Sequence, residues 1–91
     1  MRFEWDLKKT ANNLRKHGIS FKEAATVFGD QLSMTFEDPD HSINEERFVT
    51  IGESRQRRVL VVAHTDRRGV IRIISVRKAT PRERKFYEKG T

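Results

Sequence analysis

Hydrophobic and polar residues recur with two different periods along the chain, and the change of period separates predicted helices from predicted strands. Leu7, Ala11 and Leu14 recur at helical spacing and form a narrow apolar stripe, and the cations of the same segment lie on the side predicted to face solvent. Asp6 stands before the stripe and Gly18 after it, as is typical of a helix start and stop. The pattern therefore predicts a first helix between these two residues.

A second helix is predicted to begin directly after the first. Ser20 is suited to cap it, and Glu23, three residues later, completes the pattern of a capping box. The apolar face of this helix would consist of Phe21, Ala24, Ala25 and Phe28.

In the middle of the chain the period changes to two, which indicates β-strands. Residues 32–37 alternate strictly, residues 47–51 form the next candidate, and residues 59–65 are apolar on both faces, like a central strand. Residues 66–69 have the pattern of a hairpin turn, from which residues 70–76 return as the last strand. Because the connections are short, we expect these four strands to pair antiparallel.

A third helix is predicted at the end of the chain. Thr80 is its cap, Pro81 stands at its first position, and Glu83 completes a second capping box. We expect Phe86 to anchor this helix to the sheet while its Lys and Arg side chains stay in water.

Two remaining segments complete the predicted fold. Residues 2–5 alternate and suit a short edge strand, and residues 38–44 are typical of a surface loop. The order is then two N-terminal helices, an antiparallel sheet of about four strands and a C-terminal helix. This is an α+β fold, and the 91 residues form a single domain, 1–91, with one modest core.

Charge is distributed unevenly along the chain. Residues 1–54 hold 7 Lys/Arg and 10 Asp/Glu, a net charge of −3, whereas residues 55–91 hold 12 Lys/Arg and 3 Asp/Glu, a net charge of +9. A half-chain this basic indicates a polyanionic partner, with nucleic acid first and an acidic protein second. A solvated basic surface on an ordinary soluble protein would show the same charge.

Several kinds of chemistry are excluded by what the sequence lacks. It has no cysteine, which excludes disulfides and thiol catalysis and fits a cytoplasmic protein. The longest apolar run, residues 59–63, is far too short to cross a bilayer, and residues 1–6 turn acidic at once, unlike a signal peptide. We therefore expect no membrane association. The three histidines lack ligand spacing and no phosphate-cradling glycine loop is present, so we expect neither metal nor other cofactor.

Cationic residues on the predicted strands are the remaining candidates for function. In the last strand, strict alternation places Arg72 and Lys78 on one face and Arg77 on the other. Unpaired charge on a sheet face is costly, so each cation either binds an anion or reaches water or a partner such as Glu46. On the adjacent strand His64 is either a packed, hydrogen-bonded side chain or a catalytic one.

Such a set permits RNA cleavage without a metal ion. RNA carries its own nucleophile, the 2′-hydroxyl, so an enzyme needs a base, an acid and cations for the developing charge. His64 or Glu46 could be the base, and Tyr87 or His64 could be the acid or a platform for base stacking. The residues that could hold the phosphate are Arg47, Arg72, Arg77 and Lys78, among which a bidentate arginine fits best.

Segments spread along the chain match, in order, the motifs of one known family. They are FEWD at residues 3–6 followed by Lys8 and Asn13, KHGISFKEA at 16–24, EERF at 45–48, IG at 51–52, VVAHT at 61–65, and RIISVRKA at 72–79 followed by Glu83 and Tyr87. In these segments the chain resembles the BrnT toxins, and the resemblance covers nearly its whole length.

The resemblance implies the toxin half of a type II toxin–antitoxin pair, with a RelE-like fold and a ribonuclease activity that halts translation. The implied partner is a BrnA-like antitoxin that binds DNA, and the complex would repress its own operon. The toxin itself would contact RNA, free or on the ribosome, and operator DNA only through the antitoxin. The implied site is a basic sheet face helped by the last helix, carried over to Arg47, His64, Arg72, Arg77, Lys78 and Tyr87, with Glu46 as a weaker addition.

Two other functions stay open at this point. One is a non-catalytic module whose basic half binds nucleic acid or an acidic protein, for which each cation would contribute a small, salt-dependent share of the affinity. The other is a DNA-binding repressor acting alone. It is disfavoured because the second predicted helix is mostly apolar and has Lys22 as its only cation.

Overall fold

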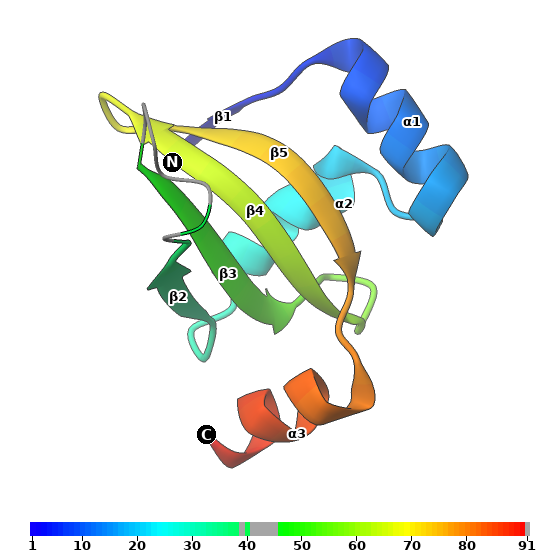
Figure 1. The fold of residues 1–91 in the computed structure, drawn as a ribbon, viewed down its shortest axis with the longest axis vertical. Helices are drawn as coiled ribbons and strands as arrows, with labels where there is room; N and C mark the ends of the chain where they lie inside the picture. The colour runs from blue at the N-terminus through cyan, green and yellow to red at the C-terminus, as the bar shows by residue number, and fades with distance from the viewer. Residues whose placement is uncertain (39, 41–45, 91) are drawn as a thin grey trace.

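The computed structural model describes residues 1–38, 40 and 46–90 of the chain. Across these residues the chain forms three α-helices, a short 3-10 helix and a sheet of five strands in the order β1-β5-β4-β3-β2 (Figure 1). The predicted α+β class is confirmed. The elements are β1 Arg2–Glu4, α1 Leu7–His17, α2 Phe21–Thr26, η1 Val27–Gly29, β2 Met34–Glu37, β3 Arg47–Glu53, β4 Val59–Arg67, β5 Val70–Lys78 and α3 Pro81–Lys89.

Two further expectations concern the loop before β3 and membrane-spanning helices. The surface loop expected at residues 38–44 lies largely outside the described residues, which include only Asp38 and Asp40 of it. Among the described segments, no helix has both the length and the apolar character needed to cross a membrane.

The sheet is mixed, and it has one strand more than the expected four. Strands β2, β3, β4 and β5 pair antiparallel in sequence order, as their short connections predict. The edge strand expected at residues 2–5 is present as β1, but it pairs in parallel with β5, with Glu4 beside Arg72. A parallel pair needs a long connection, and here two α-helices, the 3-10 helix and three strands lie between its members.

The helix ends follow the local signals in the sequence. The Asp6 side chain accepts a hydrogen bond from the backbone N–H of Lys8 at 2.8 Å, and Gly18 ends α1 in the left-handed conformation with φ 71°. The capping box of Thr80 and Glu83 at α3 is complete. At these two helices the boundaries were therefore readable from single residues.

The capping box expected at α2 is only half formed. The backbone N–H of Glu23 donates to the Ser20 hydroxyl at 3.1 Å, as predicted. The Glu23 carboxylate, however, accepts hydrogen bonds from Ser54 and Arg58, which lie beyond β3. A charged guanidinium is a stronger partner than a backbone N–H, so this side chain ties α2 to the sheet instead of closing its own cap.

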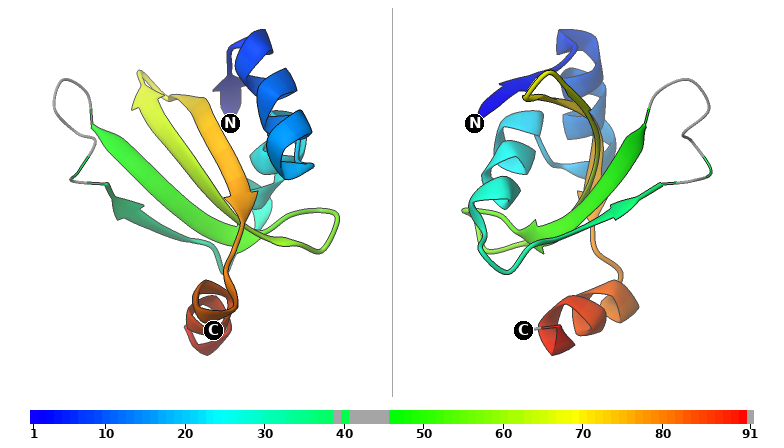
Figure 2. Two further views of the ribbon diagram at one scale, coloured as in Figure 1. Left: turned by 45° about the vertical axis from the view of Figure 1, so that its right-hand side comes forward. Right: turned by 90° about the vertical axis from the view of Figure 1, so that its left-hand side faces the viewer.

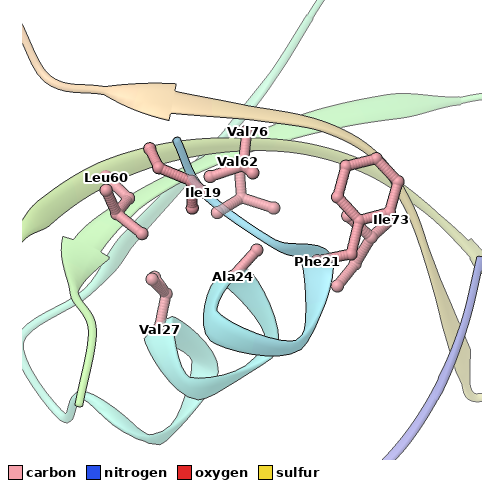
Figure 3. Close-up of a cluster of buried hydrophobic side chains, with 8 residues drawn as sticks. All are labelled: Ile19, Phe21, Ala24, Val27, Leu60, Val62, Ile73 and Val76. Carbon is pink, nitrogen blue, oxygen red and sulfur yellow. The ribbon is translucent and has the colours of Figure 1, made fainter. Parts of the chain in front are cut away.

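The main core lies between α2 and strands β4 and β5 (Figure 3). Among the described side chains of α1, only Asn13 is buried, while Leu7 and Leu14 are 78% and 52% exposed. The apolar stripe of α1 therefore faces water, whereas the sequence pattern predicted that it would be buried. The core side chains are Ile19, Phe21, Ala24, Val27, Leu60, Val62, Ile73 and Val76.

Hydrogen bonds of one buried amide attach α1 to the rest of the fold. The Asn13 amide nitrogen donates to the carbonyls of Ile19 at 3.0 Å and Val76 at 2.9 Å, and its oxygen accepts the N–H of Val76 at 3.1 Å. These three bonds hold the helix against β5 although its leucines make little contact with the core.

An extra residue in β5 changes which side chains share a face of the sheet. Ala63 of β4 pairs with Ser75, but the next residue, His64, pairs with Ile73, so Ile74 is left over as a bulge in this ladder. A bulge shifts the alternation of side chains by one residue. Strict alternation along β5 therefore assigns side chains to the wrong face of the sheet on one side of Ile74.

The bulge places two arginines together and separates the lysine from them. Arg77 pairs with Val61, whose side chain belongs to the cluster beneath α3, and Arg72 on the other side of the bulge points to the same face. Lys78 pairs with Leu60, a core residue beneath α2. The expected grouping of Arg72 with Lys78 is thus wrong. We call the face that carries the two arginines the open face.

Helix α3 packs at one end of the open face, away from α1 and α2 (Figure 2). Tyr87 is its buried side chain, and Phe86, the predicted anchor, is 54% exposed. The Phe86 ring instead contacts Phe36 of β2, with ring centroids 6.0 Å apart. The anchoring cluster consists of Ile51, Val59, Val61, Ala79 and Tyr87.

Candidate functional site

The open face contains a cleft of about 420 Å³. Its apolar floor comes from the middle of β3 and β4, with Val49, Val61 and Ala63. Polar and charged side chains from five different parts of the chain surround this floor: His17, Asp38, Arg47, Ser75, Arg77 and Glu83. An apolar floor beside α3, with charges around it, is suited to an extended polar ligand.

Arg77 lies at the edge of the cleft where β5 leads into α3. Its Nη1 and Nη2 donate to the two carboxylate oxygens of Glu83 at 2.7 and 2.9 Å, and Glu83 also accepts the N–H of Thr80 at 2.9 Å. The hydrogen bonds from Arg77 lower the pKa of Glu83 to about 2, and those to Glu83 raise the pKa of Arg77. Both groups are therefore charged at neutral pH, and the guanidinium is held in a fixed orientation.

Arg47 approaches the cleft from the start of β3. In the sheet register it lies in one row with Thr65 and Arg72, across β3, β4 and β5. Neighbouring strands are about 4.8 Å apart, so the Cα atoms of the two arginines are roughly 10 Å apart. Arg72 forms an ion pair with Glu4 of β1 at 3.6 Å, and it lies beyond the residues that line the cleft.

Three titratable cleft residues were not among the predicted site residues: Glu83, described above, and two others, His17 and Asp38. His17 is the exposed last residue of α1, and Asp38 follows β2, with its N–H donating to the carbonyl of Arg47 at 2.8 Å. Imidazole and carboxylate groups are the usual general acids and bases of enzymes. No local spacing relates these two residues. The one signal for His17 was its place in the KHG segment of the family motif.

His64 lies on the helix-covered face and not in the cleft. Its ring packs edge-on against Phe28 and is stacked on Phe48, with centroid distances of 4.9 and 5.9 Å, and Nε2 lies 2.7 Å from the Thr50 hydroxyl. Burial lowers the pKa of His64 to about 4. It is therefore neutral at physiological pH, and the geometry supports the packed histidine among the two readings of the sequence.

Three further predicted residues also lie outside the cleft lining. Tyr87 is buried under α3 and donates its hydroxyl to Asp30, and burial together with this contact raises the pKa of Tyr87 to about 12. Lys78 is exposed on the other face, and Glu46 is exposed immediately before β3. Of the predicted residues, the cleft brings together Arg47 and Arg77.

The described part of the chain contains no group of three or more histidine and carboxylate side chains placed to hold a metal ion. What the cleft does offer is two guanidinium groups, one imidazole and two carboxylates. Guanidinium groups bind phosphate oxygens, and the imidazole and the Asp38 carboxylate can exchange protons, so the arrangement can bind and cleave a phosphodiester.

Comparison with known proteins gives the family. A family model described as "Ribonuclease toxin, BrnT, of type II toxin-antitoxin system" matches residues 5–83. The chain belongs to the BrnT family. The crystal structure of the BrnT ribonuclease toxin of Brucella abortus is similar, with a TM-score of 0.67 and 23% identity over 88% of this chain and 97% of that one. No individually curated protein sequence matches the chain.

The BrnT match confirms the family resemblance seen in the sequence. It extends from Trp5 to Glu83 and so includes every residue that lines the cleft, from His17 onward. The structural similarity to the Brucella toxin shows a shared fold. The BrnT family is one of ribonuclease toxins in type II toxin–antitoxin systems.

Proposed function

We propose that the protein is a RelE-like endoribonuclease toxin that cleaves RNA in the open-face cleft without a metal ion, acting in the cytoplasm to halt translation. Family membership and the net charge of +9 over residues 55–91 support an RNA substrate. The observation that carries the proposal is that Arg47 and Arg77 share one cleft with His17 and Asp38.

Arg77 and Arg47 bind the scissile phosphate. As the 2′-oxygen attacks phosphorus, negative charge grows on the phosphate oxygens, and donors fixed in advance stabilise it most. Glu83 fixes Arg77 but takes two of the five N–H donors of a guanidinium, and the Lys78 carbonyl takes a third, so two donors remain. In addition, 45% of the Arg77 side chain remains exposed. Arg77 is therefore oriented and still able to bind an anion.

Asp38 and His17 move the protons. The base must remove the 2′-hydroxyl proton, and the acid must protonate the leaving 5′-oxygen, so that the P–O5′ bond breaks and a 2′,3′-cyclic phosphate forms. Glu83 is a poor proton acceptor at neutral pH because its pKa is about 2. We therefore assign the base to Asp38 and the acid to His17, which line the same cleft.

The test is cleavage of a defined RNA by the purified protein in EDTA, with and without translating ribosomes. We expect the native protein to cleave, and His17→Asn and Arg77→Gln each to lose about 100-fold or more in rate. Lys16→Gln and Lys78→Gln are matched controls, because each removes a cation beside a cleft residue but outside the cleft lining. Both should cleave at nearly the native rate.

The same assay decides between a nuclease and a non-catalytic binding module. A module would leave RNA intact under every condition, and the three substitutions that remove a Lys or Arg would weaken RNA binding by similar, salt-dependent amounts. Cleavage that EDTA abolishes would refute the metal-free mechanism. Urea unfolding of each variant shows that a lost activity is not a lost fold.

We infer further that a BrnA-like antitoxin neutralises the toxin and that the two together repress their operon. A type II family implies a protein antitoxin, and the exposed Leu7, Ala11 and Leu14 of α1 support a protein partner. Since Lys8 and Arg15 flank the stripe, its complement is an acidic amphipathic helix. Leu14→Glu should reduce co-purification with the antitoxin at unchanged RNA cleavage. The complex, but not the toxin alone, should retard operator DNA, and retardation by the toxin alone would contradict this.

A further inference from the structure

Two exposed phenylalanine rings lie beside the cleft, and neither has a role in the chemistry above. Phe36 of β2 is 47% exposed and Phe86 of α3 is 54% exposed. Their ring centroids are 6.0 Å apart and the rings are tilted by 48°. Single exposed apolar residues are common on protein surfaces. Here two half-exposed rings touch, although Tyr87 and not Phe86 anchors α3 to the sheet.

The pair lies next to cleft residues of β3 and α3. Phe36 pairs with Val49, which belongs to the cleft floor, and therefore points to the open face. Arg47 stands two residues from Val49 on the same strand, so its Cα is about 7 Å away. Phe86 lies one helical turn beyond Glu83, which also lines the cleft. A strand of RNA whose phosphate is bound by the arginines would thus reach the two rings.

Two cations flank Phe86 on α3, where the other charged neighbour, Glu83, is paired with Arg77. Arg82 and Lys89, four residues before and three residues after Phe86, are its neighbours on the surface of α3, and both are exposed. Exposed aromatic rings among cations, continuous with a phosphate site, are the arrangement that binds single-stranded nucleic acid. A protein partner can also use aromatic side chains, but the connection to the arginine cleft favours RNA.

We propose that Phe36 and Phe86 form a nucleobase subsite, on which an unpaired base next to the cleaved phosphodiester stacks. This inference rests on the proposed RNA-cleaving function and adds to it how the substrate is chosen. A base can stack here only after leaving its own helix, because a ring inside a duplex already has neighbours on both faces. The subsite therefore selects single-stranded segments, whatever their sequence.

The experiment uses a single-stranded oligonucleotide that contains 2-aminopurine and 2′-O-methyl riboses, which remove the nucleophile and prevent cleavage. Stacking of 2-aminopurine on the rings quenches its fluorescence. We expect Phe36→Ala and Phe86→Ala each to weaken binding roughly 5- to 50-fold and to abolish the quench. Phe86→Trp should keep both. Leu32→Ala, a substitution of an apolar side chain that is as exposed as Phe86 and lies outside the cleft lining, should keep the native affinity and quench.

Each result assigns the pair one role. Native affinity and quench in both alanine variants would overturn the subsite, as would a native protein that does not bind the probe. Unchanged RNA binding with lost antitoxin binding would also overturn it and assign the rings to a protein partner. If the native protein cleaves no RNA but quenching still depends on the rings, the subsite stands and the proposed function fails. Phe86→Leu, which keeps apolar volume, controls for misfolding and should lose the quench.

Discussion

The buried imidazole of His64 makes the stability of the protein depend on pH. Burial lowers the pKa of His64 from 6.5 in the unfolded chain to about 4 in the folded protein. Between these values the unfolded state binds a proton that the folded state does not, so stability is complete above about pH 6.5 and falls as the pH drops toward 4. One pKa unit corresponds to about 1.4 kcal/mol, so the lowered pKa contributes about 3 kcal/mol to the free energy of unfolding. Of this, about 2 kcal/mol is lost between pH 7.5 and 5.

Urea unfolding of the native protein and of His64→Gln at pH 7.5 and 5.0 measures this effect. The carboxyl groups titrate in both proteins and cancel in the comparison. We expect the native protein to lose about 2 kcal/mol more than the variant over this pH range. Equal losses would refute the assignment of His64 as a buried neutral side chain. Because the residue lies outside the cleft, the folded variant should also cleave RNA like the native protein.

Other expectations follow from single contacts. Asn13→Ala removes three buried hydrogen bonds and should cost about 3 kcal/mol in urea unfolding, whereas Asn12→Ala, its exposed neighbour, should change stability by less than about 0.5 kcal/mol. Similar costs for the two would contradict the attachment of α1 through this amide. Tyr87→Phe removes the hydroxyl that donates to Asp30 and should cost about 1 kcal/mol in the same assay. Its rate of RNA cleavage should be unchanged. A large loss of rate in a folded variant would indicate that Tyr87 takes part in catalysis.

Local signals in the sequence predicted most of the fold because they act over a few residues. Asp6, Gly18 and Thr80 each decide a helix end through bonds to their nearest neighbours. The parallel pairing of β1 depends instead on contacts between residues 2–4 and residues 70–72, which no local pattern encodes. The bulge at Ile74 could not be predicted either, because an extra apolar residue in an apolar strand does not change the hydrophobic pattern.

The candidate site could be predicted only where residue type and position are unusual together. Arg47 and Arg77 were predicted as site residues because they are cations on strands, and both line the cleft. His64 has the right chemistry, but residue type says nothing about burial, and the fold encloses it. His17 and Asp38 lie at the ends of two unrelated elements, so only the tertiary fold brings them to one cleft.

The most direct measurement concerns the nucleophile that the open-face cleft uses. A defined RNA is cleaved, its cleavage position is mapped, and the single ribose that precedes that position is then replaced by 2′-deoxyribose. We predict that the native RNA yields 2′,3′-cyclic phosphate and 5′-hydroxyl ends, and that the deoxy substitution abolishes cleavage at that position alone. Cleavage after the deoxyribose, or products with 3′-hydroxyl and 5′-phosphate ends, would contradict attack by the 2′-hydroxyl of the substrate.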